Sequence, residues 1–233
     1  MRLRHALVMT CLLLALTAPL FAGTITGKVS YSGTAPKPRT IDMSDDPNCV
    51  QRHAPKDTDE SVVTKGAHGL ANVVVYVSVG APDEGQVPTQ AVTVEQKGCR
   101  YVPHVVVLHT GQEVKVVNND QTLHNVHPMA RENRQWNKSQ PPGSAPISER
   151  FDNPEFIPVK CNVHPWMRAY FAVIKTSHFD LTKNDGAFSL PNLPPGKYTI
   201  TAWHEEYGIQ NADVTISGNE TKQLSFTFKA KPE

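Results

Sequence analysis

The chain has 233 residues, of which 39% are hydrophobic and 19% are charged. This apolar content is enough to build a core and excludes a disordered chain. Lys and Arg number 23 against 22 Asp and Glu, so the chain lacks the basic excess that a nucleic-acid-binding protein needs. The 19 prolines argue against a mostly helical protein, because each one removes a backbone donor and stops a helix.

The first residues have the pattern of a secretory signal peptide. Arg2 and Arg4 precede an almost wholly apolar run at 6–16, and small residues follow up to a cleavage site near Ala22. The alternative is an uncleaved N-terminal anchor, although the run is short for a membrane span. We therefore expect a signal peptide at 1–22 and an exported, soluble product with no membrane span after cleavage.

Short segments of β type follow one another along the rest of the chain. Alternating residues predict a first strand at 24–31, and the continuous β-branched run at 72–79 is typical of a strand covered on both faces. Residues 105–108 and 114–117 flank a turn around Gly111, which indicates a hairpin. The other predicted strands are 169–174, 187–190, 197–203, 212–216 and 223–228.

Two polar stretches that contain proline, 35–67 and 131–150, are predicted to be loops. No segment has a sustained helical period. We therefore expect an all-β fold of the sandwich class.

The sharpest motif places Cys161, His164 and Met167 at equal three-residue steps, downstream of His124. Two imidazoles, a thiolate and a thioether are the ligands of a blue-copper site, in which a trigonal His₂Cys plane has a weak axial Met. The same spacing would also put three residues on one face of a helix. Prolines before and within the motif argue against that helix.

Other chemistries use some of the same residues. A tetrahedral zinc site would take His124, His127, Cys161 and His164, but it leaves Met167 without a role. A c-type haem attachment needs a second cysteine that the motif lacks. A Cys–His hydrolase needs an orienting group and a cleft, and nothing in the sequence points to them.

The stretch 101–126, together with Cys161-x-x-His164-x-x-Met167, resembles the cupredoxins of the plastocyanin and amicyanin group. The resemblance covers about residues 88–176 and implies a cupredoxin β-sandwich at 86–176 that holds one type-1 copper. The metal ligands that it implies are His124, Cys161, His164 and Met167.

The same resemblance implies roles for residues around the metal. Asn125 corresponds to the residue that braces the cysteine loop by hydrogen bonding and so helps to hold the cofactor. The ring edge of His164 corresponds to the electron port, which reaches the surface in an apolar patch. The candidates for that patch are Pro128, Pro165 and Trp166.

The flanking segments resemble a second family. Residues 182–198, which run from an Asn-Asp-Gly turn to a Pro-Pro-Gly turn, are similar to the carboxypeptidase-regulatory, transthyretin-like domain. The resemblance implies that an opening strand at 23–29 and the buried strand at 72–79 belong to the same sandwich. We therefore expect a transthyretin-like sandwich made of 23–85 plus 177–233, with the cupredoxin inserted into it. The whole arrangement resembles exported bacterial methylamine-utilisation or plastocyanin-like proteins, which implies the periplasm.

Cys49 and Cys99 remain as a pair if Cys161 binds copper. In an oxidising compartment we expect a disulfide between them. The alternative is a second metal site with His53 and His104. Further along the chain, 204–206 is expected to be a solvated loop.

These expectations describe an electron carrier and not an enzyme. The redox partner would be a protein such as a c-type cytochrome or a dehydrogenase, and the transthyretin-like sandwich would contact a glycan or an envelope component. One alternative is copper trafficking or storage with the same ligands. Another is a glycan- or protein-binding module in which the metal is structural.

Overall fold

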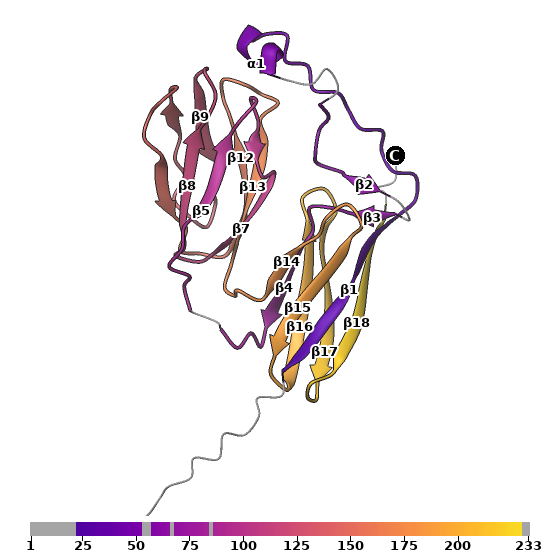
Figure 1. The fold of residues 1–233 in the computed structure, drawn as a ribbon. Helices are drawn as coiled ribbons and strands as arrows, with labels where there is room; N and C mark the ends of the chain where they lie inside the picture. The colour runs from indigo at the N-terminus through magenta and orange to yellow at the C-terminus, as the bar shows by residue number, and fades with distance from the viewer. Residues whose placement is uncertain (1–21, 53–56, 66–67, 84–85, 230–233) are drawn as a thin grey trace, which may run out of the picture.

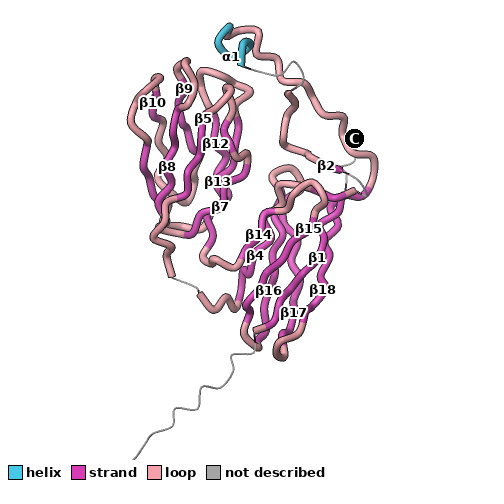
Figure 2. The backbone as a smooth tube through the Cα atoms, in the orientation of Figure 1, coloured by secondary structure: helices cyan, strands magenta, loops and turns pink. Residues whose placement is uncertain are grey.

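The computed structural model describes residues 22–52, 57–65, 68–83 and 86–229, and the predicted signal peptide lies outside this part except for Ala22. Nearly all regular structure in it is β, which confirms the expected fold class (Figure 2). The helix α1 (Pro47–Arg52) spans less than two turns. No helix among the described residues is long and apolar enough to cross a membrane.

The first β-sandwich is built from both ends of the described chain. Its strands are β1 (Gly23–Ser32), β2 (Thr64–Lys65), β3 (Gly69–Leu70), β4 (Val74–Val79), β14 (Phe179–Leu181), β15 (Ala187–Leu193), β16 (Gly196–His204), β17 (Gly208–Ile216) and β18 (Thr221–Lys229). One sheet has the order β15-β1-β3-β2 with β18 also paired to β1, and the other has the order β14-β4-β16-β17. The first and last strands run parallel, from Thr24 opposite Thr221 to Ser32 opposite Lys229.

The second β-sandwich is formed by the residues between β4 and β14 (Figure 1). Its strands are β5 (Val92–Gln96), β6 (Tyr101–Val102), β7 (Val105–His109), β8 (Glu113–Asn118), β9 (His124–Pro128), β10 (Lys138–Gln140), β11 (Ile147–Arg150), β12 (Glu155–Lys160) and β13 (Arg168–Ile174). The two sheets have the orders β10-β9-β12-β13-β7 and β11-β8-β5-β6. Alternating residues such as Val116, Ile157 and Phe171 fill the core between them.

The prediction of a strand covered on both faces is confirmed in β4. Val75 and Val77 belong to the core of the first sandwich, whereas Val74 packs toward the second. Both faces of this strand therefore contact apolar side chains, which explains its continuous β-branched sequence.

The predicted hairpin around Gly111 is wrong. β7 pairs with β13 and β8 pairs with β5 and β11, so the two segments lie in different sheets. Gly111 has a φ of 75°, a backbone conformation that glycine adopts easily both in a hairpin turn and in a turn that connects two sheets. The turn is therefore a corner between the sheets, and a short glycine turn in the sequence does not distinguish a corner from a hairpin.

The predicted loop at 131–150 is also wrong in part, because it contains the edge strands β10 and β11. β10 pairs with β9, and β11 pairs with β8, so each sheet gains an edge strand. The other predicted loop, 35–67, contains α1 and the short strand β2. A long connection carries α1 away from β1 to the far end of the second sandwich, near β9 (Figure 1).

The two sandwiches share an apolar contact. Val74 and Trp203 of the first pack against Val105, Val107 and Ile174 of the second. The Trp203 ring also stacks on Phe156 at a centroid distance of 4.2 Å. Where the two sandwiches meet, β4 and β16 therefore cover the outer face of the sheet β10-β9-β12-β13-β7.

A buried ion pair lies beside this contact and corrects the expected solvated loop at 204–206. His204 is the last residue of β16 and is fully buried, and the Glu205 side chain is only 6% exposed. Glu205 accepts a hydrogen bond from the ring of His104 in the second sandwich. Burial opposes the charged form of His104, but the bond to Glu205 holds its pKa above the usual range. Burial likewise raises the pKa of Glu205.

Candidate metal centre

The predicted metal ligands lie at one end of the second sandwich. His124 is the first residue of β9, while Cys161, His164 and Met167 lie in the short connection between the paired strands β12 and β13. Backbone hydrogen bonds from Cys161 N to Met167 O (3.1 Å) and from Met167 N to His164 O (3.0 Å) close this connection into a compact turn. All four side chains are buried.

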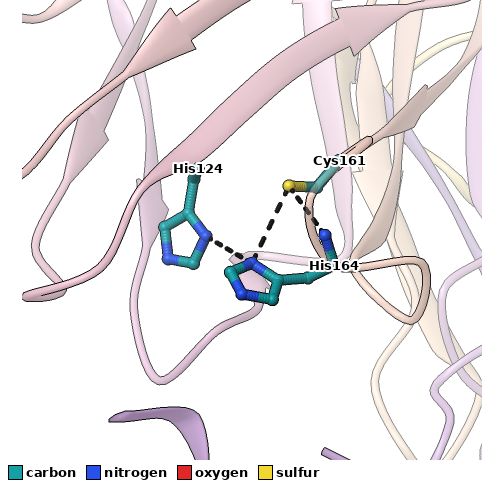
Figure 3. A group of neighbouring side chains, drawn as sticks. All are labelled: His124, Cys161 and His164. Atoms are coloured by element: carbon teal, nitrogen blue, oxygen red, sulfur yellow. Dashed lines mark hydrogen bonds between the residues drawn. The ribbon is translucent and has the colours of Figure 1, made fainter. Parts of the chain in front are cut away.

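Two ring nitrogens and one sulfur converge in this pocket (Figure 3). The Nδ1 atoms of His124 and His164 are 2.9 Å apart, and the Sγ atom of Cys161 lies 3.9 Å from Nδ1 of His164. Met167 belongs to the same buried core cluster as Cys161. A pair of imidazole nitrogens and a soft sulfur donor, shielded from water, is a ligand set that fits copper.

Hydrogen bonds hold the Cys161 sulfur in position. The backbone N–H of His164 points at Sγ over 3.4 Å, and Oδ1 of Asn125 accepts a hydrogen bond of 2.6 Å from the N–H of Asn162. Asn125 thus ties β9 to the Cys161 turn. Burial opposes ionisation of Cys161, but hydrogen bonds from His124 and from backbone N–H groups outweigh it and lower the pKa of the thiol.

Each histidine is fixed from its other side by a carboxylate. Nε2 of His124 bonds Oδ2 of Asp120 at 2.9 Å, and Nε2 of His164 bonds Oδ2 of Asp46 at 3.0 Å. Carboxylates in this position set the tautomer and the ring orientation of a ligating histidine, so that the Nδ1 atoms face the pocket. Burial raises the pKa of Asp46, but hydrogen bonds from His164 and Thr122 dominate and lower it to about 2.

Neither carboxylate was predicted from the sequence. Asp120 precedes His124 by four residues, and its carboxylate is anchored by the N–H groups of Gly98 and Cys99. Because Asp120 lies only four residues before His124, the sequence itself could have indicated that the two side chains are partners. Asp46 comes from the distant stretch before α1, and no local pattern connects it to His164.

Residues 41–52, here called the cap segment, cover the outer edge of the metal pocket. The cap segment includes α1, and it is fixed by a disulfide between Cys49 and Cys99 with a Cα–Cα distance of 5.6 Å. Asp46 adds a hydrogen bond of 2.9 Å from Thr122. The disulfide between Cys49 and Cys99 confirms the prediction from the sequence. In the alternative second metal site, His53 lies outside the described residues and His104 is paired with Glu205.

The expectation that the His164 ring edge reaches the surface is wrong. His164 is 2% exposed, because Asp46 and Cys49 of the cap segment contact its Nε2 atom at 3.0 and 3.7 Å. Trp166 is half-buried and packs beside the His164 ring at a centroid distance of 5.0 Å. Its indole N–H donates to the carbonyl of Cys99, so this tryptophan helps to close the pocket.

His127, the extra ligand of the zinc alternative, lies apart from the converging atoms. Its Nδ1 atom is 3.0 Å from Oδ1 of Asn162, and its Nε2 atom is 3.1 Å from Nε2 of Gln135. Among the described residues, three groups of side chains could each share one ion, and none of them includes His127.

Comparisons with known proteins give matches to parts of the chain. Residues 172–229 match the family model of the carboxypeptidase regulatory-like domain, which covers the end of β13 and the strands β14 to β18. A search of curated protein sequences gives no significant match.

Several solved structures are similar to part of the chain. A purple cupredoxin from Nitrosopumilus maritimus is 17% identical over 35% of this chain and 98% of its own, with a TM-score of 0.31. A methionine-to-alanine mutant of amicyanin in its Cu(I) form is 20% identical over 42% of this chain and 97% of its own, with a TM-score of 0.32. A copper-containing nitrite reductase from Thermus scotoductus SA-01 is 15% identical over 62% of this chain, with a TM-score of 0.34, and this chain spans 28% of that enzyme.

Proposed function

We propose that this protein is an exported type-1 copper protein that carries single electrons between redox partners. The observation that carries the proposal is the convergence of two imidazole Nδ1 atoms, 2.9 Å apart, with the Cys161 sulfur in a buried pocket. His124, Cys161 and His164 would hold one copper ion, and the Met167 thioether would be a further ligand. The bound ion supplies a couple between Cu(I) and Cu(II) in which one electron moves and no bond forms or breaks.

The protein's own residues keep this pocket rigid and dry. Asp120 and Asp46 fix the two imidazole rings, and Asn125 fixes the turn that carries Cys161. The burial of the donor groups excludes water from them. A pocket held in this way rearranges little when the charge of its occupant changes, which is the requirement for fast outer-sphere electron transfer.

We further propose that the protein works in the periplasm as a carrier and not as an enzyme. Its partner would be a one-electron protein such as a c-type cytochrome or a dehydrogenase. Contact of the first sandwich with a glycan or an envelope component stays a prediction.

One observation favours copper storage or trafficking as a second candidate. The cap segment covers the His164 ring, and a covered metal exchanges slowly with the medium. In a storage protein Cu(I) would bind tightly and the Cu(II) form would be unstable. An electron carrier instead needs both states to be stable in the same pocket.

The test is an optical titration of the mature, metal-free protein with Cu(II), followed by voltammetry. We expect one equivalent of Cu(II) to give an intense visible band from thiolate-to-copper charge transfer, and a reversible potential. Cys161→Ser should abolish the band because a hydroxyl does not replace the soft thiolate. Val163→Ser, at an exposed position of the same turn, is the matched control and should keep it. A colourless or irreversible Cu(II) form would favour storage, and an unchanged band in Cys161→Ser would contradict the copper site.

A further inference from the structure

The burial of His164 raises the question of where an electron enters or leaves the pocket. Asp46 and Cys49 cover the Nε2 edge of this ring, and the Cys49–Cys99 disulfide holds them there. A partner that approached the His164 edge would meet the cap segment and not a metal ligand. Another ligand must therefore provide the shorter route to the surface.

Cys161 provides that route. A hollow of about 450 Å³ opens on the outer face of the sheet β10-β9-β12-β13-β7. Cys161 lies on its wall between Lys160 and Asn162. Asn162 is exposed, and Pro165 on the same turn is exposed as well. Cys161 is thus a buried ligand residue that also lines this hollow, and its backbone continues directly into the exposed Asn162.

The hollow carries positive charge. Lys160 and Arg168 both line it, and none of the described residues that line it carries a carboxylate. Lys160 stands directly opposite Arg168 on β13 and opposite His127 on β9, so these three side chains share one face of the sheet. Four carboxylates, Asp59, Glu60, Glu205 and Glu206, line the neighbouring cleft beside Arg168. Three of them are already paired with cationic side chains: Glu205 with His104, Glu60 with Arg100 and Asp59 with Arg39.

Apolar groups complete this surface. Pro158, Pro165 and Tyr170 line the same hollow. Tyr170 packs against Trp203 at a centroid distance of 5.4 Å, which joins the hollow to the rigid contact between the sandwiches. An apolar floor with a basic rim is typical of a surface that binds a partner transiently through steering and a small desolvated contact.

We propose that this basic hollow, and not the His164 ring, is the docking site of the redox partner, and that the partner presents an acidic face around a one-electron metal centre. The proposal rests on the proposed copper function and specifies its route. One electron passes from the reduced centre of the partner by way of Cys161 and reduces Cu(II) to Cu(I), while the partner is oxidised by one electron and no proton moves. The reverse transfer uses the same path.

The first test maps the hollow on the metal-free protein by NMR. The first probe is hexacyanochromate(III), a paramagnetic trianion that does not exchange electrons with the metal-free protein. The second is its cationic counterpart, hexaamminechromium(III). We expect the anion to broaden amide signals at 127–129 and 158–170, and the cation to leave them sharp. Broadening centred on the cap segment, or spread evenly over the surface, would overturn the proposal.

Charge reversal tests the same surface with a matched control. In Lys160→Glu/Arg168→Glu the selective broadening should disappear, whereas Lys197→Glu, at an exposed position of the first sandwich, should keep it. Because this map needs no copper, it succeeds or fails independently of the proposed copper function.

The second test measures electron transfer in the copper-loaded protein. The probe is a reduced c-type cytochrome of net negative charge, mixed with the oxidised protein by stopped flow at low ionic strength. We expect the double reversal to slow the second-order rate roughly tenfold or more, because several unit charges close to the contact change sign, and added salt should shrink the difference. Lys197→Glu should match the wild type. Equal rates for the wild type and the double variant would overturn the docking site even if copper binds as proposed.

Discussion

The imidazole rings of His124 and His164 are each held in place from two sides. Each has its Nε2 atom on a carboxylate and its Nδ1 atom toward the other ring. Burial, together with the neighbouring His124, outweighs the bond to Asp46 and lowers the pKa of His164, which favours the neutral imidazole that a metal needs. Burial also opposes protonation of His124, but Asp120 and Cys161 outweigh it and raise the pKa of this histidine. Metal binding at this pocket is therefore expected to displace a proton.

Asp46 offers a test of the carboxylate at His164. Asp46→Asn keeps a hydrogen-bond acceptor near Nε2 but removes a negative charge that favours Cu(II). We expect Cu(II) affinity to fall roughly 10- to 100-fold, as for other partners of metal-ligating histidines, and the reduction potential to rise. Competition titrations with a chelator and voltammetry measure the two effects.

Asp45 is the matched control, since it carries the same charge one residue earlier and is exposed. Asp45→Asn should leave the affinity and the potential close to those of the wild type. Equal effects of both substitutions would mean that Asp46 acts only through the general field of the cap segment.

Met167 can be tested through the same potential. It is almost completely buried in the cluster that contains Cys161. An axial oxygen donor favours Cu(II) over Cu(I), so Met167→Gln should lower the reduction potential and keep a coloured site. A potential that rises or stays fixed would show that this methionine is not the axial ligand.

At the scale of elements, the cap segment is the feature that sets this pocket apart from an open one. It reaches the pocket from a long connection between β1 and β2, and its apolar residues Ile41 and Met43 pack on the core of the second sandwich. The Cys49–Cys99 disulfide spans 50 residues. In the chain-entropy model a loop of this length stabilises the folded state by about 4 kcal/mol.

The disulfide leads to a prediction for Cys49→Ala/Cys99→Ala. We expect the free energy of unfolding to fall by about 2–4 kcal/mol, measured by urea denaturation. We also expect His164 to become reactive toward diethyl pyrocarbonate, because the cap segment is then held only by Asp46 and by packing. Thiol titration of the denatured, copper-free mature protein should find one thiol, from Cys161. Three thiols in the wild type would contradict the disulfide.

Periodicity identified β4 and the all-β class because those patterns depend on local burial. It did not separate the Gly111 corner from a hairpin, since pairing partners are set by contacts far away in the chain. The converging atoms of His124, Cys161 and His164 follow from a motif of ligand chemistry, whereas the contact between Asp46 and His164 arises only when the cap segment folds over the pocket.

At the scale of the whole molecule, the two sandwiches are joined by more than their linkers. β4 leads into the second sandwich and β14 leads out of it, and these two strands are paired with each other. The apolar contact of Trp203 with Phe156 and the buried pair of His104 and Glu205 lie between the sandwiches. The proposed division into 23–85 plus 177–233 and 86–176 is consistent with this pairing. The proposed docking hollow lies beside the same contact, so the first sandwich supports its floor.

The buried pair makes the stability of this contact depend on pH. The pKa of His104 is raised in the folded state by its bond to Glu205, despite burial, and burial raises the pKa of Glu205. Both groups bind protons more tightly in the folded than in the unfolded state, so their contribution to stability is full at low pH and is lost as pH rises. For His104, the loss occurs between its unfolded pKa of about 6.5 and its raised folded pKa.

We therefore expect the free energy of unfolding of the wild type to fall from pH 6 to pH 9 by more than that of Glu205→Gln. The glutamine variant should also be less stable at pH 6 by roughly 1–3 kcal/mol, because it loses a charge-assisted hydrogen bond in a buried site. Glu132→Gln, at an exposed position of the second sandwich, should follow the wild-type pH dependence. Urea denaturation at several pH values measures all three proteins. Parallel curves for the wild type and Glu205→Gln would mean that the pair does not change its protonation in this range, and the coupling of the two sandwiches would then rest on the apolar contact around Trp203 alone.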